Sequence, residues 1–171
     1  GVRAFLCYMM AHPGKKLIFM GTELAQFKEW DYQGQLDWLL LDYPLHRITQ
    51  EFFREINHFY LQNRPLWQID DNWQGFKWIF ADDKQRNLLS FRRIDESGKE
   101  IIVVVNFSLS PWPAYRLGVP TPGKYRLIFN SDDQRFGGGS QTGQLIASKP
   151  IACHGLKNSV VLDLPALSAF F

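Results

Sequence analysis

The feature that most constrains the fold is the regular alternation of short apolar segments and turn sequences that begins near residue 65. The turns are rich in Asp, Gly and Pro, as at residues 95–99 and 120–123. The expected strands cover residues 76–81, 87–94, 101–107, 115–119, 124–130, 159–164 and 167–171. Short strands with a turn about every 8–12 residues are typical of an antiparallel β-sandwich. The sequence therefore predicts a mostly β fold, with a sandwich over residues 65–171.

Two details of this region carry further expectations. Alternating aromatic side chains mark the first strand, and we expect them to pack between the two sheets: Trp73, Phe76, Trp78 and Phe80. Residues 131–150 lose the apolar content of the flanking segments and contain three consecutive glycines at 137–139, so a long flexible loop is expected there. These glycines lack the following Lys-Ser/Thr of a phosphate-binding loop, so they do not indicate nucleotide binding.

The first 64 residues follow a helical period instead. Residues 2–11 carry apolar side chains at near-helical spacing, and the sequence His-Pro-Gly at 12–14 ends this helix with a turn. Residues 16–20 form a short apolar run bounded by turn residues, which is typical of a strand buried on both faces of a parallel sheet. Residues 45–62 predict a second helix with one apolar stripe, formed by Ile48, Phe52, Phe53, Ile56, Phe59 and Tyr60.

Helix, turn and strand in this order are half of a β/α repeat, and one strand flanked by helices cannot close a sheet or a barrel. The chain starts with Gly1 rather than Met, within a helical pattern that has no N-cap residue, which predicts a piece of a longer protein. We therefore expect residues 1–62 to be partly mobile, or to dock through intermolecular contacts of the stripe formed by Phe52, Phe53, Ile56 and Phe59.

The segment that follows the expected strand, residues 21–38, is polar and aromatic with little periodicity. Ligands of α/β folds bind outside the carboxyl ends of parallel strands, so this loop is the candidate substrate-binding surface. The candidate residues are Glu23, Gln26, Trp30 and Asp37. Trp30 has two interpretations, as a platform that stacks on a sugar face or as an anchor of the loop. Carboxylate pairs are available here, but no further pocket walls exist to raise the pKa of one of them, so a free-standing glycosidase is not expected.

Other classes of function find little support in the sequence. The net charge is +2 without a clustered basic run, so no nucleic-acid partner is expected. No apolar run approaches the roughly 20 residues of a membrane span, so no membrane partner is expected either. Cys7 and Cys153 lie far apart and belong to no metal or redox spacing, which favours a reduced, cytoplasmic protein. No metal site and no cofactor are expected, because no ligand spacing is shared by His12, His46, His58 and His154.

Several motifs together carry a family resemblance. The run PGKKLIFMGTELAQ at residues 13–26, followed by Glu29-Trp30 and Leu36-Asp37-Trp38, resembles the bacterial 1,4-α-glucan (glycogen) branching enzymes of the α-amylase superfamily. The resemblance continues through residues 75–83, 106–108, 115–120, 122–125, 130–138 and 162–167, and so covers nearly the whole chain. The family usually has Asn at the position of Thr22, which is a conservative departure.

The resemblance implies a division of the chain. Residues 1–64 would be the C-terminal end of a (β/α)8 catalytic barrel, with residues 17–20 as its eighth strand, and residues 65–171 would be the all-β C-terminal sandwich. Enzymes of this family cleave an α-1,4-glucan and transfer the segment to a 6-hydroxyl, which forms an α-1,6 branch. Their nucleophile, acid/base and second Asp follow earlier strands, upstream of Gly1, so the chain holds no catalytic residue and is expected to be inactive alone.

In the complete enzyme, Glu23, Gln26, Trp30 and Asp37 would line or support the substrate cleft. The implied partners are an α-glucan and the rest of the barrel. Three alternatives stay open at this point: a non-catalytic glucan-binding module with a tryptophan platform, a purely structural sandwich, and part of a related α-amylase-superfamily hydrolase.

Overall fold

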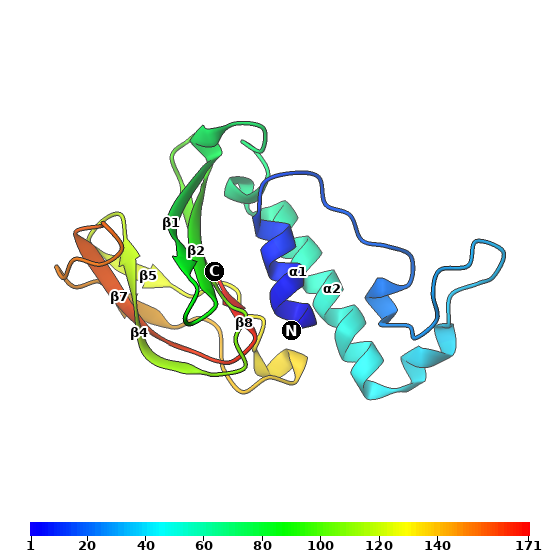
Figure 1. Ribbon diagram of the computed structural model, residues 1–171. Helices are drawn as coiled ribbons and strands as arrows, with labels where there is room; N and C mark the ends of the chain where they lie inside the picture. Colours follow the sequence, from blue (N-terminus) through cyan, green and yellow to red (C-terminus); the bar gives the residue numbers. More distant parts are fainter.

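The computed structural model describes residues 1–171 and arranges them in three layers (Figure 1). The first layer is a pair of helices, α1 (Val2–Ala11) and α2 (Pro44–Gln62). The second is an antiparallel sheet in the order β1-β2-β3-β8, formed by Phe76–Asp83, Leu88–Ile94, Glu100–Asn106 and Ser168–Phe170. The third layer consists of two antiparallel pairs, β4 (Trp112–Val119) with β7 (Asn158–Leu164) and β5 (Lys124–Arg126) with β6 (Leu145–Ala147). The predicted antiparallel sandwich is confirmed.

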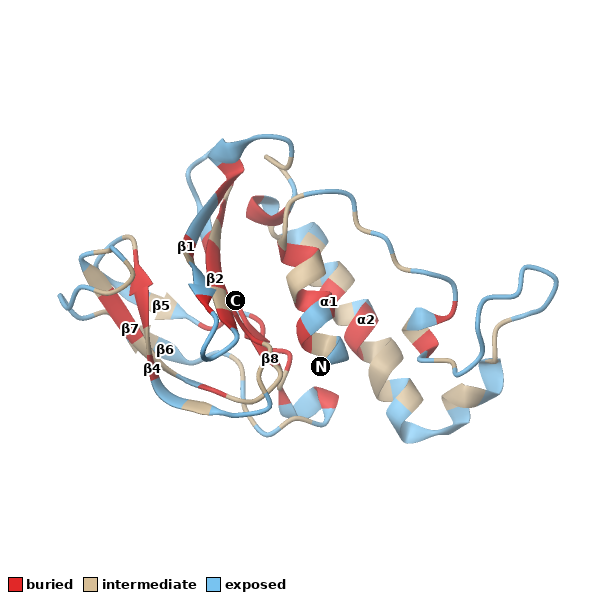
Figure 2. Ribbon diagram, viewed as in Figure 1, coloured by how far each residue is buried: buried red, intermediate tan, exposed pale blue.

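Strand β3 shows how the sequence builds this layering. Its side chains alternate, so Val103 and Val105 face the helices while Ile102 and Val104 face the third layer. Residues 101–105 of β3 are all apolar because both faces of the four-stranded sheet are covered. The molecule consequently has two cores, one between the helices and this sheet and one inside the sandwich (Figure 2).

The apolar stripe of α2 packs on the β-layers of the same chain. Phe52 meets Phe136 edge to face with ring centroids 5.0 Å apart, and Phe59 lies 4.8 Å from Phe129. Phe52, Phe53 and Ile56 are buried. The expectation that this stripe would need an intermolecular partner is therefore wrong, because the sandwich supplies the partner.

The run 131–150 is also more ordered than predicted. It contains a short 3-10 helix, Gln134–Phe136, and strand β6. The Asp132 carboxylate accepts hydrogen bonds from the Gly139 amide (3.1 Å) and the Ser140 hydroxyl (2.9 Å), and Phe136 is buried against α2. Side-chain hydrogen bonds thus replace the apolar content whose loss predicted a flexible loop.

The aromatic residues before and along β1 do not all pack between the sheets. Phe76 is buried, but Trp73, in the 3-10 turn before β1, is 80% exposed, and Trp78, on the edge strand β1, is 44% exposed. A register shift after Trp78 places Phe80 against His154, with the rings stacked 4.6 Å apart.

The expected buried strand at residues 16–20 is not formed. Leu17 is 76% exposed, Phe19 and Met20 are exposed, and no strand of the chain pairs with this segment. A strand needs the hydrogen bonds of a neighbouring strand, so an apolar run alone does not produce one. Figure 2 shows this segment and the loop after it as largely exposed.

A fully buried arginine joins the helical layer to the sheet. Arg93 of β2 has no exposed surface, and its guanidinium donates to the carbonyl oxygens of Ala11 (2.6 Å), Gly75 (3.2 Å) and Ile69 (3.3 Å). It also donates to Oδ1 of Asp70 at 2.7 Å, and Oδ2 of Asp70 accepts the Gly14 amide at 2.9 Å. The end of α1 and the turn after it are therefore held by β2.

None of the helices combines the length and apolar character needed to cross a lipid bilayer.

Candidate functional site

The polar loop between Gly21 and Asp37 projects from the helices on the side opposite the sandwich (Figure 1). It begins with a 3-10 turn, Thr22–Leu24, and leads into a second one, Trp38–Asp42. Leu24 is fully buried, and Nδ1–H of His46 on α2 donates to the Leu24 carbonyl at 2.7 Å. The base of the loop is thus fixed to the first turns of α2.

The loop encloses an open hollow of about 430 Å³, which we call the loop hollow. Its lining residues are Phe19, Met20, Gly21, Thr22, Gln26, Lys28, Glu29 and Trp30. The Gln26 side chain folds over Gly21 so closely that a Cβ atom at residue 21 would lie 2.2 Å from Cδ of Gln26. The Gln26 side chain could move aside, but Gly21 also has a φ of +87°, a left-handed backbone conformation that strains other residues, so glycine is favoured there.

An aromatic wall forms one side of the loop hollow. The Trp30 ring meets Phe19 edge to face at 5.5 Å and lies 5.9 Å from the Tyr32 ring. About half of Trp30 (49%) is exposed, so its ring is held by aromatic contacts and is still accessible to a ligand. Both interpretations of Trp30 from the sequence, as platform and as anchor, are compatible with this placement.

An ion pair connects the middle of the loop to its C-terminal end. Nζ of Lys28 donates to Oδ1 of Asp37 at 2.8 Å. This hydrogen bond and the negative charge of Asp37 raise the pKa of Lys28, with a smaller contribution from Asp31. Asp31 in turn accepts the Gln33 amide at 2.9 Å, which shapes the tip of the loop.

The four candidate residues from the sequence do not all meet in the loop hollow. Gln26 and Trp30 line it, whereas Glu23 and Asp37 do not. Glu23 is half-buried in the first 3-10 turn and makes no side-chain hydrogen bond, and Asp37 is engaged by Lys28.

Sequence reasoning missed several lining residues, among them Phe19, Lys28 and Glu29. The sequence pattern places Phe19 in an expected buried strand, and the pairing of Lys28 with Asp37 across nine residues follows no helix or strand period. The available signal was local, because Lys28 and Glu29 directly precede Trp30.

The arrangement is suited to binding a ring that carries hydroxyl groups. An indole face can stack on its apolar side, while the Gln26 amide, the Lys28 ammonium and the Glu29 carboxylate can exchange hydrogen bonds with hydroxyls. The structure contains no cluster of three His, Cys, Asp or Glu side chains placed to hold a metal ion. The loop hollow is therefore a candidate binding wall.

Comparison with known proteins gives two results. The family model described as "Alpha amylase, C-terminal all-beta domain" matches residues 78–171. Three similar proteins each carry the name "1,4-alpha-glucan branching enzyme GlgB". The protein from Aquifex aeolicus is 45% identical over 173 residues, the one from Francisella tularensis subsp. novicida is 42% identical over 171, and the one from Vibrio cholerae is 40% identical over 171. They align with 98–99% of this chain, which spans only about a quarter of their length (27%, 27% and 24%).

Proposed function

The chain belongs to the family of alpha-amylase C-terminal all-beta domains, and from this premise we propose that it forms the C-terminal part of a 1,4-α-glucan branching enzyme. The observation that carries the proposal is identity of 40–45% to proteins of that name over nearly the whole chain. This similarity includes residues 1–77, which precede the match to the all-beta domain. The parent enzyme would transfer an α-1,4-glucan segment to a 6-hydroxyl in glycogen synthesis.

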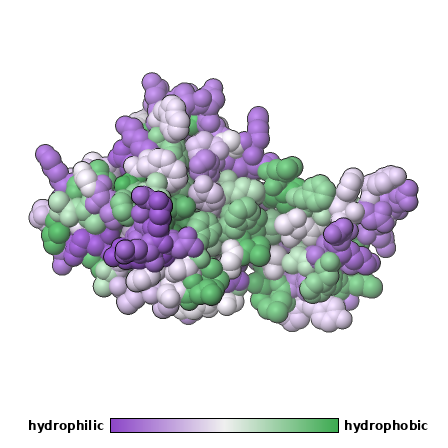
Figure 3. Space-filling view, in the orientation of Figure 1, coloured by the Kyte–Doolittle hydropathy of each residue, from purple (hydrophilic) through white to green (hydrophobic).

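In this proposal residues 1–64 complete a (β/α)8 barrel and residues 65–171 form the sandwich that braces it. Exposed apolar side chains support a large partner on the helical side: Val2, Phe5, Leu17, Phe27, Leu39 and Leu45. Figure 3 shows a hydrophobic area over α1 and the first part of α2, where such a partner would lie. In the barrel, residues 17–20 would gain neighbouring strands and the loop hollow would become one wall of the substrate cleft.

The α-glucan substrate and the remaining barrel are thus the proposed partners. The catalytic carboxylates would come from the part of the relatives that this chain does not span. We also place the parent enzyme in the cytoplasm, because Cys7 and Cys153 are unpaired, as is usual in a reducing compartment.

Replacing Trp30 with alanine in the complete branching enzyme is expected to lower kcat/KM on amylose about fivefold. Loss of a stacking platform removes on the order of 1 kcal/mol of binding, and 1.4 kcal/mol corresponds to a factor of ten. Branch formation is measured by chain-length analysis after debranching. The isolated chain is expected to form no branches in the same assay.

The matched control is Trp67→Ala, because Trp67 donates its indole N–H to Leu61 at 3.2 Å, outside the loop hollow. An equal effect of both substitutions would contradict the role of Trp30 as a substrate platform.

Glu23 is tested in the same assay as a residue that orients a neighbouring group near the cleft. Unchanged kinetics of Glu23→Ala would remove that assignment. Branching by the isolated chain would overturn the proposal that its catalytic groups lie elsewhere.

A second candidate function, glucan binding by the sandwich itself, is favoured by the exposure of Trp73 and Trp78 at the β1 edge. The Trp78 ring is held edge to face on Phe76 at 4.9 Å, so a rigid indole is presented to solvent. We expect the isolated chain to be retarded in amylopectin gels and Trp78→Ala to reduce the retardation at least twofold, while Trp67→Ala leaves it unchanged. Migration of the unsubstituted chain at the same rate with and without amylopectin would exclude this binding function.

A further inference from the structure

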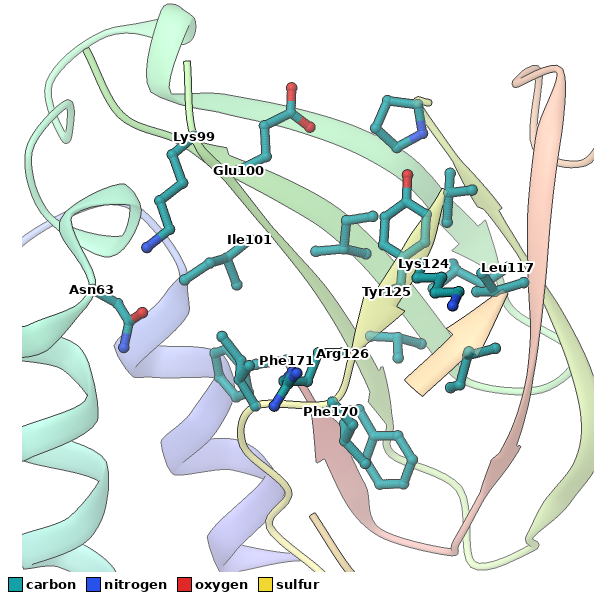
Figure 4. A pocket seen from close by; sticks show the side chains of 18 of the residues that line it. Asn63, Lys99, Glu100, Ile101, Leu117, Lys124, Tyr125, Arg126, Phe170 and Phe171 are labelled. Carbon is teal, nitrogen blue, oxygen red and sulfur yellow. The ribbon is translucent and has the colours of Figure 1, made fainter. Parts of the chain in front are cut away.

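A groove of about 760 Å³ lies between β3 and β5, and Figure 4 shows the side chains that line it. Its floor is apolar and includes Val104, Leu117 and Phe170 from the interior of the sandwich. A sugar ring would bury its hydroxyls there without hydrogen-bond partners, which is unfavourable. The loop hollow has an amide, an ammonium and a carboxylate among its lining groups, so it suits an α-glucan better. Binding in the loop hollow then depends on what holds the loop in shape.

Two arms of the loop run to and from its tip. The first arm, residues 25–30, carries Lys28 and Trp30, and the second arm, residues 35–37, leads into the 3-10 turn Trp38–Asp42. The Leu40 amide donates to the Asp37 carbonyl at 3.0 Å, and the 3-10 turn runs directly into α2. Asp37 is therefore a fixed point at the C-terminal end of the loop.

The ion pair of Lys28 with Asp37 is the only hydrogen-bonded link between these arms. Nζ of Lys28 lies 2.8 Å from Oδ1 of Asp37, and no other hydrogen bond joins residues 25–30 to residues 35–42. The other hydrogen bonds near the tip are local, such as those of the Gln33 and Gly34 amides to Asp31 (2.9 and 3.3 Å). Without the ion pair, hydrogen bonds would hold the first arm only at its base.

The Trp30 ring has no hydrogen bond of its own to fix its orientation. Its ring is held by contacts with the rings of Phe19 (5.5 Å) and Tyr32 (5.9 Å), and about half of it is exposed. Lys28 precedes Trp30 by only two residues. The ion pair therefore fixes the stretch of backbone from which the indole projects.

We propose that Lys28 and Asp37 are positioning residues for the α-glucan: their ion pair closes the loop and holds the Trp30 indole where it stacks on a sugar ring. The inference rests on the proposed function and deepens it, because it states how the binding wall is held. Asp37 acts without touching the substrate, in agreement with its place outside the lining of the loop hollow. Lys28 does line the loop hollow, so the test separates positioning from direct donation to a sugar hydroxyl.

The test alters the ion pair in the complete branching enzyme. Lys28→Met and Asp37→Asn are each expected to raise KM on amylose about threefold with kcat unchanged, because a displaced platform loses binding that the ground state and the transition state share. The exchanged pair, Lys28→Asp with Asp37→Lys, is expected to restore KM, which a lysine that donates directly to the substrate would not allow. The matched control is Lys84→Met, which removes the exposed Lys84–Asp82 ion pair (3.1 Å) and is expected to leave KM unchanged.

Two further measurements show whether the ion pair acts through Trp30. In a Trp30→Ala background, Lys28→Met is expected to add no increase in KM, since the group that it positions is gone. In the isolated chain labelled with 5-fluorotryptophan, the fluorine NMR resonance of Trp30, assigned by Trp30→Phe, is expected to shift in Lys28→Met and to return in the exchanged pair. Tm is expected to change by less than about 2 °C, because exposed ion pairs contribute little to stability.

An unmoved Trp30 resonance in Lys28→Met, or a KM equal to that of the unsubstituted enzyme, would overturn the proposal. So would an exchanged pair that leaves KM raised, because Lys28 would then serve the substrate directly. Failure of the proposed function would appear elsewhere, as unchanged kinetics of Trp30→Ala. The resonance of Trp30 requires neither glucan nor activity, so it decides in either case whether the ion pair holds the indole.

Discussion

Replacing Arg93 with methionine is expected to lower the free energy of unfolding by about 3–5 kcal/mol. Methionine is long enough to occupy much of the same space, but it removes the hydrogen bonds to three carbonyl oxygens and leaves the Asp70 carboxylate without its cation. A buried acceptor without a donor costs about 1–3 kcal/mol by itself. Urea unfolding followed by tryptophan fluorescence measures the loss.

The neighbouring arginine provides the matched control. Arg92 forms a 3.3 Å ion pair with Glu100 that is partly open to solvent, so Arg92→Met is expected to cost only about 0–1 kcal/mol. Arg93→Lys keeps the positive charge, but the lysine ammonium cannot donate to several acceptors at once as the planar guanidinium does. An intermediate loss of unfolding free energy is therefore expected. A loss below about 1 kcal/mol for Arg93→Met would contradict its role as the link between β2 and the end of α1.

The sandwich could be predicted from the sequence because its signals are local. Turn residues at 95–99 and 120–123 and the β-branched run of β3 determine where strands begin and end without reference to distant residues. The link made by Arg93 could not be predicted in the same way. Arg93 directly follows Arg92, and nothing local distinguishes the buried arginine from the partly exposed one. Its acceptors at Ala11 and Gly75 are 82 and 18 residues away in the chain.

The candidate site could be predicted from the sequence only in part. The apolar run at 17–20 has the composition of a buried strand, but strand formation depends on neighbours that a single segment does not contain. The loop hollow then depends on contacts between side chains, such as Trp30 with Phe19 and Lys28 with Asp37, that follow no period. Composition indicated the segment that forms the loop hollow, and two of the four named side chains line it.

The stripe of α2 was predicted correctly as an apolar face, while its partner was not, because amphipathic periodicity states which face is buried and not what buries it. The partner is an aromatic cluster from the segment between β5 and β6, far along the chain, and it includes Phe129 and Phe136. Residues 1–64 and the sandwich thus share one core even though the sequence pattern changes between them.

Phe52→Ala is therefore expected to destabilise the whole chain, by about 3–5 kcal/mol. Phe52 is fully buried, with its ring 5.0 Å from Phe136 and 6.0 Å from Phe129, so the substitution leaves a cavity at the centre of the helix–sandwich interface. Urea unfolding is followed by tryptophan fluorescence and by circular dichroism of the helices. Both signals are expected to shift together to lower urea, because one core connects the two layers.

Leu45→Ala on the same helix is the control for Phe52→Ala, because it makes a similar change in helix propensity without removing a buried side chain. Leu45 is 77% exposed, so its removal is expected to change the unfolding free energy by less than about 0.5 kcal/mol. If Phe52→Ala shifted only the helical signal and left the sandwich transition in place, the helices and the sandwich would unfold separately. The shared core would then not couple them, and the boundary near residue 64 would mark two independently folding units. Coincident transitions would instead mean that the sandwich holds α2, and with it the base of the candidate binding loop at Leu24 and His46, in place.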